Sequence, residues 1–226
     1  MTRRTWAAAA MAVAGLIASP AFSQNFVVNP SFETGDVTGW TGTGGCDFAA
    51  YNAGGVTPLA GGWTAPAPSD GVFVMLSDAG APGTCTLFQD IVLPPNRTYK
   101  LGFAAGYNYT NFGAPTAAGC EADISITTTG GVPIATFYKR TGGTTDPFAR
   151  RGSFTLPDTV AGTTVRLIMT MNSCADGPVG IVADDFSLVV FQAIPLLSPW
   201  AAALMAILMV GAGIAMTRRP EGVVRR

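Results

Sequence analysis

Tyr99-Lys100-Leu101-Gly102-Phe103-Ala104-Ala105 is the stretch of sequence that decides the fold of this chain. Its apolar side chains recur at every second position, and a period of two places them on one face of a β-strand. Residues 122–127 and 165–171 repeat the alternation. We therefore expect these segments to be β-strands with one buried face.

The rest of the central sequence extends the same pattern. Further strands are predicted at residues 72–76, 86–92, 134–138, 153–156 and 181–190, with glycine and proline turns between them. No stretch between residues 24 and 193 sustains an apolar period near 3.6, so helices are not expected there. About eight to ten short strands in one domain predict an all-β fold, a β-sandwich of the jelly-roll type.

The first 23 residues have the composition of a secretory signal peptide. Arg3 and Arg4 supply positive charge, residues 7–18 are apolar, and Ala21-Phe22-Ser23 places small residues around a cleavage site. We expect the mature chain to begin at Gln24. The alternative is an N-terminal helix that stays in the membrane.

The last 33 residues, 194–226, predict a membrane-spanning helix. Residues 201–216 carry no charged side chain, and from Ile194 the segment is long enough to cross a bilayer. Trp200 lies at one end and Arg218, Arg219, Arg225 and Arg226 at the other, which predicts the arginines on the cytoplasmic side.

The sequence of this tail resembles the IPTL-CTERM sorting signal, a relative of the PEP-CTERM tails of Gram-negative bacteria. Leu196 and Pro199 differ from the residues usual in that motif. The resemblance implies that an exosortase-like membrane enzyme cuts near Pro195 and releases or re-attaches the preceding domain. An ordinary single-span anchor is the alternative. The matching residues are Ile194, Pro195, Leu197, Ser198, Trp200, Arg218 and Arg219.

Residues 24–193 remain between the two ends and are long enough to bury one core. They hold seven Lys and Arg against thirteen Asp and Glu, a net charge of −6, although the whole chain carries −1. An acidic surface repels phosphate backbones, which argues against nucleic acid as a partner.

All four cysteines, Cys46, Cys85, Cys120 and Cys174, fall within this segment. An even number in an exported domain predicts two disulfides, for which three pairings exist. Pairing of nearby segments favours Cys46–Cys85 and Cys120–Cys174. The spacing contains no close Cys-x-x-Cys pair, which argues against zinc.

Three landmarks resemble the carbohydrate-binding-module-like jelly rolls, also described as galactose-binding-like sandwiches. They are the opening at residues 29–40 (N-P-S-F-E-T-G-D-V-T-G-W), the strand pair at 87–91 and 99–103, and the closing I-V-A-D-D-F-S-L at 181–188. They bracket nearly the whole central segment. The resemblance implies a sandwich fold but does not by itself imply a function.

The composition restricts the chemistry available. The chain has no histidine, which excludes Ser-His-Asp and Cys-His catalysis. Carboxylates remain for glycosidase-type chemistry, with Glu33, Asp123, Asp184 and Asp185 as candidates, but nothing in the sequence sets two of them across a cleft. We expect a protein that is not an enzyme.

The same carboxylates suit a structural ion. Strand alternation predicts Asp184 on the same apolar face as Val182, Phe186, Leu188 and Val190, and a buried charge needs a partner. The resemblance implies a structural calcium held by Glu33 and Asp184, with Asp36, Asp185 or backbone carbonyls of the Gly35 turn completing an oxygen shell. The alternative is that Asp184 accepts backbone N–H bonds and Glu33 is a solvated turn residue.

The densest run of aromatic and amide side chains predicts a sugar-binding loop. It comprises Tyr107, Asn108, Tyr109, Asn111 and Phe112, flanked by glycines. Aromatic faces and amide groups are the side chains with which sugar sites stack and hydrogen-bond. The alternative is that Tyr107 and Phe112 extend a strand into the core.

Two functions follow from these observations. The first is a non-catalytic, structural or adhesive protein of the cell surface or matrix, exported and sorted through its C-terminal signal, and anchored in the membrane at least before processing. The second is a carbohydrate-binding module that recognises extracellular polysaccharide through the aromatic loop.

Overall fold

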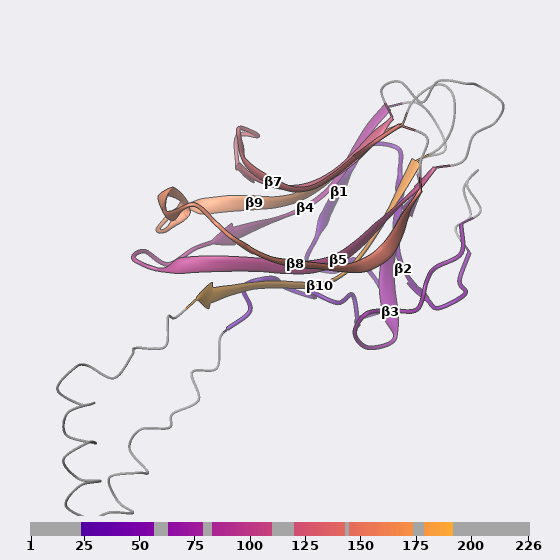
Figure 1. The fold of residues 1–226 in the computed structure, drawn as a ribbon, viewed down its shortest axis with the longest axis horizontal. Coiled ribbons are helices and arrows are strands. Elements are labelled where there is room, and N and C mark those ends of the chain that lie inside the picture. Colours follow the sequence, from indigo (N-terminus) through magenta and orange to yellow (C-terminus); the bar gives the residue numbers. More distant parts are fainter. Residues whose placement is uncertain are drawn as a thin grey trace, which may run out of the picture. The chain divides into compact units, whose positions relative to one another are not determined.

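Two antiparallel β-sheets of five strands each face one another in the computed structural model of the chain (Figure 1). The structure describes residues 24–56, 63–78, 83–109, 120–142, 145–173 and 179–191. The prediction of an all-β sandwich is therefore confirmed for the central segment.

Each sheet takes strands from both halves of the chain. The first, called the β4–β9 sheet, has the order β1 (Thr41–Thr43), β4 (Gly83–Val92), β9 (Thr164–Ser173), β6 (Glu121–Thr128) and β7 (Pro133–Thr141). The second, called the β5–β10 sheet, has the order β2 (Asp47–Asn52), β3 (Phe73–Asp78), β10 (Val179–Phe191), β5 (Thr98–Tyr109) and β8 (Asp146–Thr155). One short 3-10 helix, Asp158–Val160, precedes β9.

The core lies between the sheets and is filled by the alternating apolar residues. Leu101, Phe103 and Tyr107 of β5 are buried, as are the apolar positions of β6 and β9. Phe32 and Trp40 from the opening segment pack against Phe186 of β10. The opening segment therefore contributes aromatic side chains to the core.

The predicted facing of β10 is wrong beyond Asp184. Between Asp184 and Ser187 the strand contains an extra residue relative to β5, and Asp185 adopts a positive φ of 53°. A β-bulge of this kind changes which face the following side chains occupy. Val182 and Asp184 therefore lie on the outer face of the sheet, whereas Phe186 and Leu188 enter the core.

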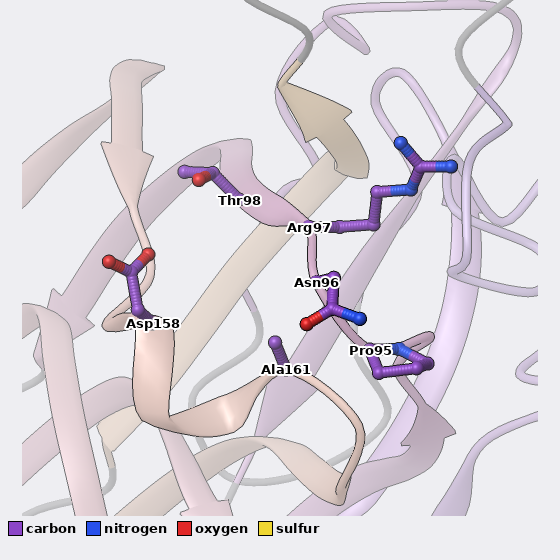
Figure 2. A pocket seen from close by; sticks show the side chains of 6 residues that line it. All are labelled: Pro95, Asn96, Arg97, Thr98, Asp158 and Ala161. Atoms are coloured by element: carbon purple, nitrogen blue, oxygen red, sulfur yellow. The ribbon is translucent and has the colours of Figure 1, made fainter.

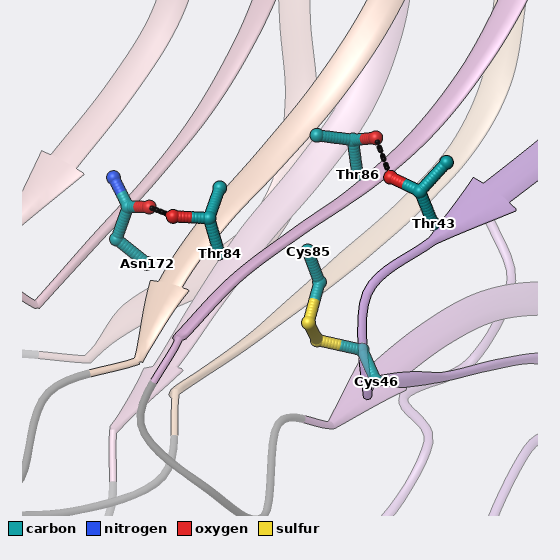
Figure 3. The surroundings of a disulfide bond; sticks show 6 residues. All are labelled: Thr43, Cys46, Thr84, Cys85, Thr86 and Asn172. Carbon is teal, nitrogen blue, oxygen red and sulfur yellow. Dashed lines mark hydrogen bonds between the residues drawn. A yellow bond between two sulfur atoms is a disulfide. The ribbon is translucent and has the colours of Figure 1, made fainter.

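The predicted Cys46–Cys85 disulfide is present, with its Cα atoms 5.8 Å apart. Figure 3 shows that it joins the segment just before β2 to strand β4. Cys120 is also disulfide-bonded, and its predicted partner, Cys174, lies outside the described residues.

Both predicted membrane-related segments, residues 1–23 and 194–226, lie outside the described residues as well. Within the described part of the chain, no helix is long and apolar enough to cross a membrane.

Candidate functional site

The outer face of the β4–β9 sheet carries an open groove of about 290 Å³ over strands β9, β6 and β7. We call it the sheet groove. Its lining comprises Asp123, Ser125, Thr127, Gly131, Pro133, Thr136, Lys139, Arg166, Ile168 and Thr170.

The strand alternation explains why these side chains lie there. Asp123, Ser125 and Thr127 alternate along β6 with residues that enter the core, so all three face outward. Asp123 pairs with Thr170 on one side and Lys139 on the other. Hydrogen-bonding groups from three strands therefore share one rigid surface.

Asp123 is the carboxylate of the sheet groove. Partial burial raises its pKa, the nearby Glu121 raises it further, and a hydrogen bond from Ser125 at 2.9 Å lowers it. A partly desolvated carboxylate of this kind accepts hydrogen bonds strongly from neutral donors such as hydroxyl groups.

The two cations that line the sheet groove are both paired. Lys139 Nζ lies 2.9 Å from Glu121 Oε2. The Arg166 guanidinium donates to both oxygens of Asp90, at 2.7 and 2.8 Å, and lies 3.8 Å above the centre of the Phe88 ring. These hydrogen bonds also lower the pKa of Asp90. The paired charges leave the groove polar without an excess of positive charge.

The predicted aromatic loop is only partly described. Tyr107 is fully buried, and its hydroxyl donates to the Gly142 carbonyl at 3.1 Å, so its ring packs in the core. Asn108 and Tyr109 belong to β5, but the structure does not describe their side chains. Asn111 and Phe112 lie outside the described residues. Sugar binding by this loop stays a prediction.

Two of the predicted calcium ligands converge on one turn. Asp184 Oδ2 accepts hydrogen bonds from the backbone N–H groups of Ser69 and Asp70, at 2.7 and 3.2 Å, and Glu33 Oε1 accepts from those of Val72 and Phe73, both at 2.9 Å. Burial raises the pKa of Asp184, and these hydrogen bonds oppose the shift. Both carboxylates therefore anchor residues 69–73.

The other two predicted ligands make different contacts. Asp36 accepts hydrogen bonds from Thr34 and Thr38 within its own exposed turn. Asp185 forms an ion pair with Arg150. No group of three or more potential metal-ligating side chains lies together among the described residues. The donor set thus fits an ion only in part, and calcium stays a prediction.

A second hollow, of about 360 Å³, lies at the end of the sandwich where β5 begins. Figure 2 shows Asn96, Arg97 and Thr98 on the segment that leads into β5, and Asp158 and Ala161 on the segment that contains the 3-10 helix. Most of these residues are exposed, and Arg97 and Asp158 extend to different sides of the loops. The arrangement does not bring their charges to a common point.

Comparisons with known proteins support the fold. No family model matches the chain, and no curated protein matches it. Among solved structures, it is similar to the carbohydrate-binding module TmCBM61, solved in complex with β-1,4-galactotriose, at 18% identity and a TM-score of 0.50 over 76% of this chain and 100% of that one.

Two other solved structures show weaker likeness. A family 16 carbohydrate-binding module has 19% identity and a TM-score of 0.43, over 73% of this chain and 99% of that one. The K3 cleaved adhesin domain of Lys-gingipain from Porphyromonas gingivalis has 14% identity and a TM-score of 0.46, over 72% and 98%.

Sequence reasoning missed the sheet groove although its residues were visible. The apolar alternation of β6 and β9 predicts which residues are buried, but it does not predict what the residues between them form. From the sequence, Asp123 is only a candidate for catalysis. The clue was the run of Asp, Ser and Thr at three successive outward positions of a single strand.

Proposed function

We propose that this protein is an exported, non-catalytic carbohydrate-binding protein that holds extracellular polysaccharide in the sheet groove. The observation that carries the proposal is the open groove in which three neighbouring strands present carboxylate, hydroxyl and amino groups. Sites built on strands hold such groups in fixed positions, as recognition of a sugar requires. The likeness to a carbohydrate-binding module supports the fold on which this proposal rests.

The charges of the groove favour neutral polysaccharides. Lys139 and Arg166 are already paired with Glu121 and Asp90, whereas Asp123 adds a carboxylate that repels acidic sugars. Neutral sugar hydroxyls suit Asp123 as an acceptor and the threonine hydroxyls as donors or acceptors.

A structural or adhesive scaffold is the competing function. In that case the domain occupies space in the matrix, and its polar face serves solubility alone. Binding measurements separate the two, because a scaffold is indifferent to substitutions in the groove as long as it stays folded.

The two ends of the chain complete the proposal. Residues 1–23 direct export, and residues 194–226 anchor the domain until an exosortase-like enzyme recognises the tail. Intact-mass measurement of the protein isolated from cells tests both steps. A mature chain beginning at Gln24 and ending near Pro195 supports them, and a chain that retains both ends contradicts them.

A structural calcium ion beside Glu33 and Asp184 is a further part of the proposal. Glu33 Oε2 and backbone carbonyls of the 69–73 turn would supply oxygen ligands of the kind that calcium prefers. Chelation should then lower the melting temperature, and calcium should restore it. An unchanged melting temperature, with no metal in the purified protein, would exclude the ion.

The decisive experiment for sugar binding is calorimetric titration of the full-length protein in a detergent without a sugar head group. The probes are neutral tetrasaccharides of galactose, glucose, mannose and xylose. We expect saturable binding to at least one probe, weakened about tenfold or more in Asp123→Ala, since a lost charged hydrogen bond is worth roughly 1.5–3 kcal/mol.

Asp158→Ala is the matched control, because Asp158 is an exposed aspartate outside the groove. A Tyr109→Ala/Phe112→Ala variant tests the aromatic loop in the same titration. Absence of binding to every probe, or equal affinity of Asp123→Ala and Asp158→Ala, would overturn the proposal for the groove.

A further inference from the structure

The outer face of the β5–β10 sheet carries a pocket of about 230 Å³, smaller than the two hollows described above. It opens between the 64–66 segment and the 145–148 segment and has Val182 of β10 in its lining. We call it the outer pocket. Because it lies on the other sheet, it is separate from the sheet groove.

Two glycines on this face, Gly106 and Gly180, allow neighbouring segments to approach the sheet closely. A Cβ atom on Gly180 would lie 1.7 Å from Cζ3 of Trp63, and one on Gly106 would lie 2.8 Å from the Phe148 backbone and from Val182. Trp63 and the Phe148 backbone therefore approach the sheet more closely than any side chain at these glycines would permit.

The outer pocket combines an apolar wall with polar rims. Val182, Phe148, Pro66 and Pro147 supply apolar surface. Val182 is almost completely buried within a small apolar cluster, against which Trp63 and Phe148 also pack. Thr64 and Thr145 are exposed at the opposite edges. Such a surface suits a ligand with one apolar face and hydroxyl groups at its edge.

Asp146 also lines the outer pocket, but its carboxylate lies on the other side of β8, where it faces β7 of the β4–β9 sheet. Its Oδ2 atom accepts hydrogen bonds from the Tyr138 hydroxyl at 2.9 Å, Arg140 Nε at 2.9 Å and Arg151 at 2.7 Å. Burial alone would raise the pKa of Asp146, but the hydrogen bonds from Arg140 and Tyr138 outweigh it and lower the pKa.

These hydrogen bonds tie the start of β8 to β7. They hold in place the 145–148 segment, which forms one side of the outer pocket.

The geometry points to a second carbohydrate site in the outer pocket, which takes a single ring of a neutral sugar. The outer pocket is smaller than the sheet groove and is bounded by residues 64–66 and 145–148, so it suits one ring and not a chain of several. The apolar face of the sugar would lie against Phe148 and Val182, and its hydroxyl groups would meet Thr64 and Thr145 at the edges of the pocket.

This inference rests on the proposed function and extends it. Two sites on opposite sheets allow one molecule to hold two polysaccharide chains, or two parts of one chain. Joining two weak sites raises the overall affinity for a repeating polymer without any new contact. The protein would then act as a cross-linker of the matrix.

The test is the same titration with neutral tetrasaccharides, applied to the full-length protein and variants that close one site each. Thr145→Trp places a large side chain at the rim of the outer pocket, and Asp123→Ala weakens the sheet groove. Thr155→Trp is the matched control, because Thr155 is an exposed threonine at the far end of β8, away from the pocket.

We expect two binding sites per chain in the wild type and in Thr155→Trp, and one in Thr145→Trp. The wild type should also make a soluble neutral polysaccharide turbid, whereas Thr145→Trp should not. Near-ultraviolet circular dichroism checks folding, and Thr64→Trp closes the pocket from its other edge if Thr145→Trp does not fold.

One site per chain, removed by Asp123→Ala and unaffected by both tryptophan variants, would overturn this inference and leave the proposed function intact. Two sites that neither tryptophan variant reduces would also overturn it. Absence of binding by the wild type to every probe would overturn both proposals together.

Discussion

On the β4–β9 sheet the outward positions of β6 and β9 carry Asp, Ser, Thr and Arg side chains, whereas on the β5–β10 sheet the corresponding positions include Gly106, Gly180 and Val182. The first face remains open and is hollowed into the sheet groove. Residues 63–73 cover part of the second, with Trp63 and Ala65 packing toward it.

This difference shows that the two outer faces of one sandwich contribute differently to stability. Polar side chains allow a sheet face to stay exposed to solvent. An apolar face needs a cover, and the groups that hold the cover in place then contribute to stability. We therefore expect large stability effects from substitutions at the covered face and small ones at the open face.

The largest effect on stability should follow loss of the Cys46–Cys85 disulfide. This bond ties the start of β2, in the β5–β10 sheet, to β4 in the β4–β9 sheet. Its cysteines are 39 residues apart in sequence. A loop of this length corresponds to about 4 kcal/mol in the chain-entropy model. We expect Cys46→Ser/Cys85→Ser to lose about that much in urea unfolding.

The free-thiol content of that variant serves as its control, since it should show that the Cys120 disulfide has remained intact. An unfolding midpoint equal to that of the wild type would mean that the two sheets hold together without this link.

Gly180→Ala should have the next largest effect on stability, because the added methyl group would collide with Trp63 of the segment that covers the β5–β10 sheet. The new Cβ atom would lie 1.7 Å from Trp63 and 2.4 Å from the backbone oxygen of Ser77. Overpacking typically costs about 1–3 kcal/mol, and the rigid backbone contact places this case near 3 kcal/mol. Thermal and urea unfolding measure the loss.

Gly45→Ala is the matched control, since an added Cβ there meets no atom within 4 Å. Addition of Trp63→Ala to Gly180→Ala should restore only part of the stability, because the contact with Ser77 remains. Equal stability of Gly180→Ala and Gly45→Ala would show that residues 63–73 do not pack on the sheet.

Asp184→Ala removes a carboxylate that holds Ser69 and Asp70 against the β5–β10 sheet. It should lower the free energy of unfolding by roughly 2 kcal/mol. The carboxylate is fully buried and binds the backbone N–H groups of Ser69, Asp70 and Asp185. Donors left without partners account for the loss. Asp184→Asn should lose less, since its amide oxygen can still accept from Ser69 and Asp70.

Asp36→Ala tests whether any aspartate near this turn would have the same effect. Asp36 is exposed and binds only within its own turn, so urea unfolding should not change detectably. Unfolding curves of Asp184→Ala that match those of Asp36→Ala would contradict the anchoring role.

The alternation of apolar and polar residues predicted the strands well, because burial of one face of each strand produces this alternation. All eight predicted runs overlap observed strands, and Cys46–Cys85 was paired correctly. Strands β1 and β2 were missed. β1 has three exposed residues, Thr41, Gly42 and Thr43, so no apolar period marks it.

The candidate sites were harder to predict because they depend on geometry that alternation does not contain. The bulge at Asp185 reversed the facing of Phe186, and the roles of Glu33 and Asp184 depend on a turn distant in sequence. The sequence left two roles open for Tyr107, a sugar-binding loop residue or an extension of the strand into the core. The length of β5 carries it into the core, so the second role is confirmed for Tyr107.

The smallest effect should come from Asp123→Asn on the open face. Because the folded state raises the pKa of Asp123, it binds the proton more tightly than the unfolded chain, so wild-type stability falls as the pH rises above about 3.8, the ordinary value. Asp123→Asn lacks this loss and should be more stable than the wild type above that pH. Solvent at the carboxylate should keep the difference below about 1 kcal/mol.

Urea unfolding of both proteins between about pH 3 and 7 measures the difference. It should be absent at the acid end, appear as the pH rises and then level off. A variant less stable than the wild type at neutral pH would mean that the Asp123 carboxylate stabilises the open face. A gain in stability together with weaker sugar binding would instead mark Asp123 as a residue retained for recognition at a small cost in stability.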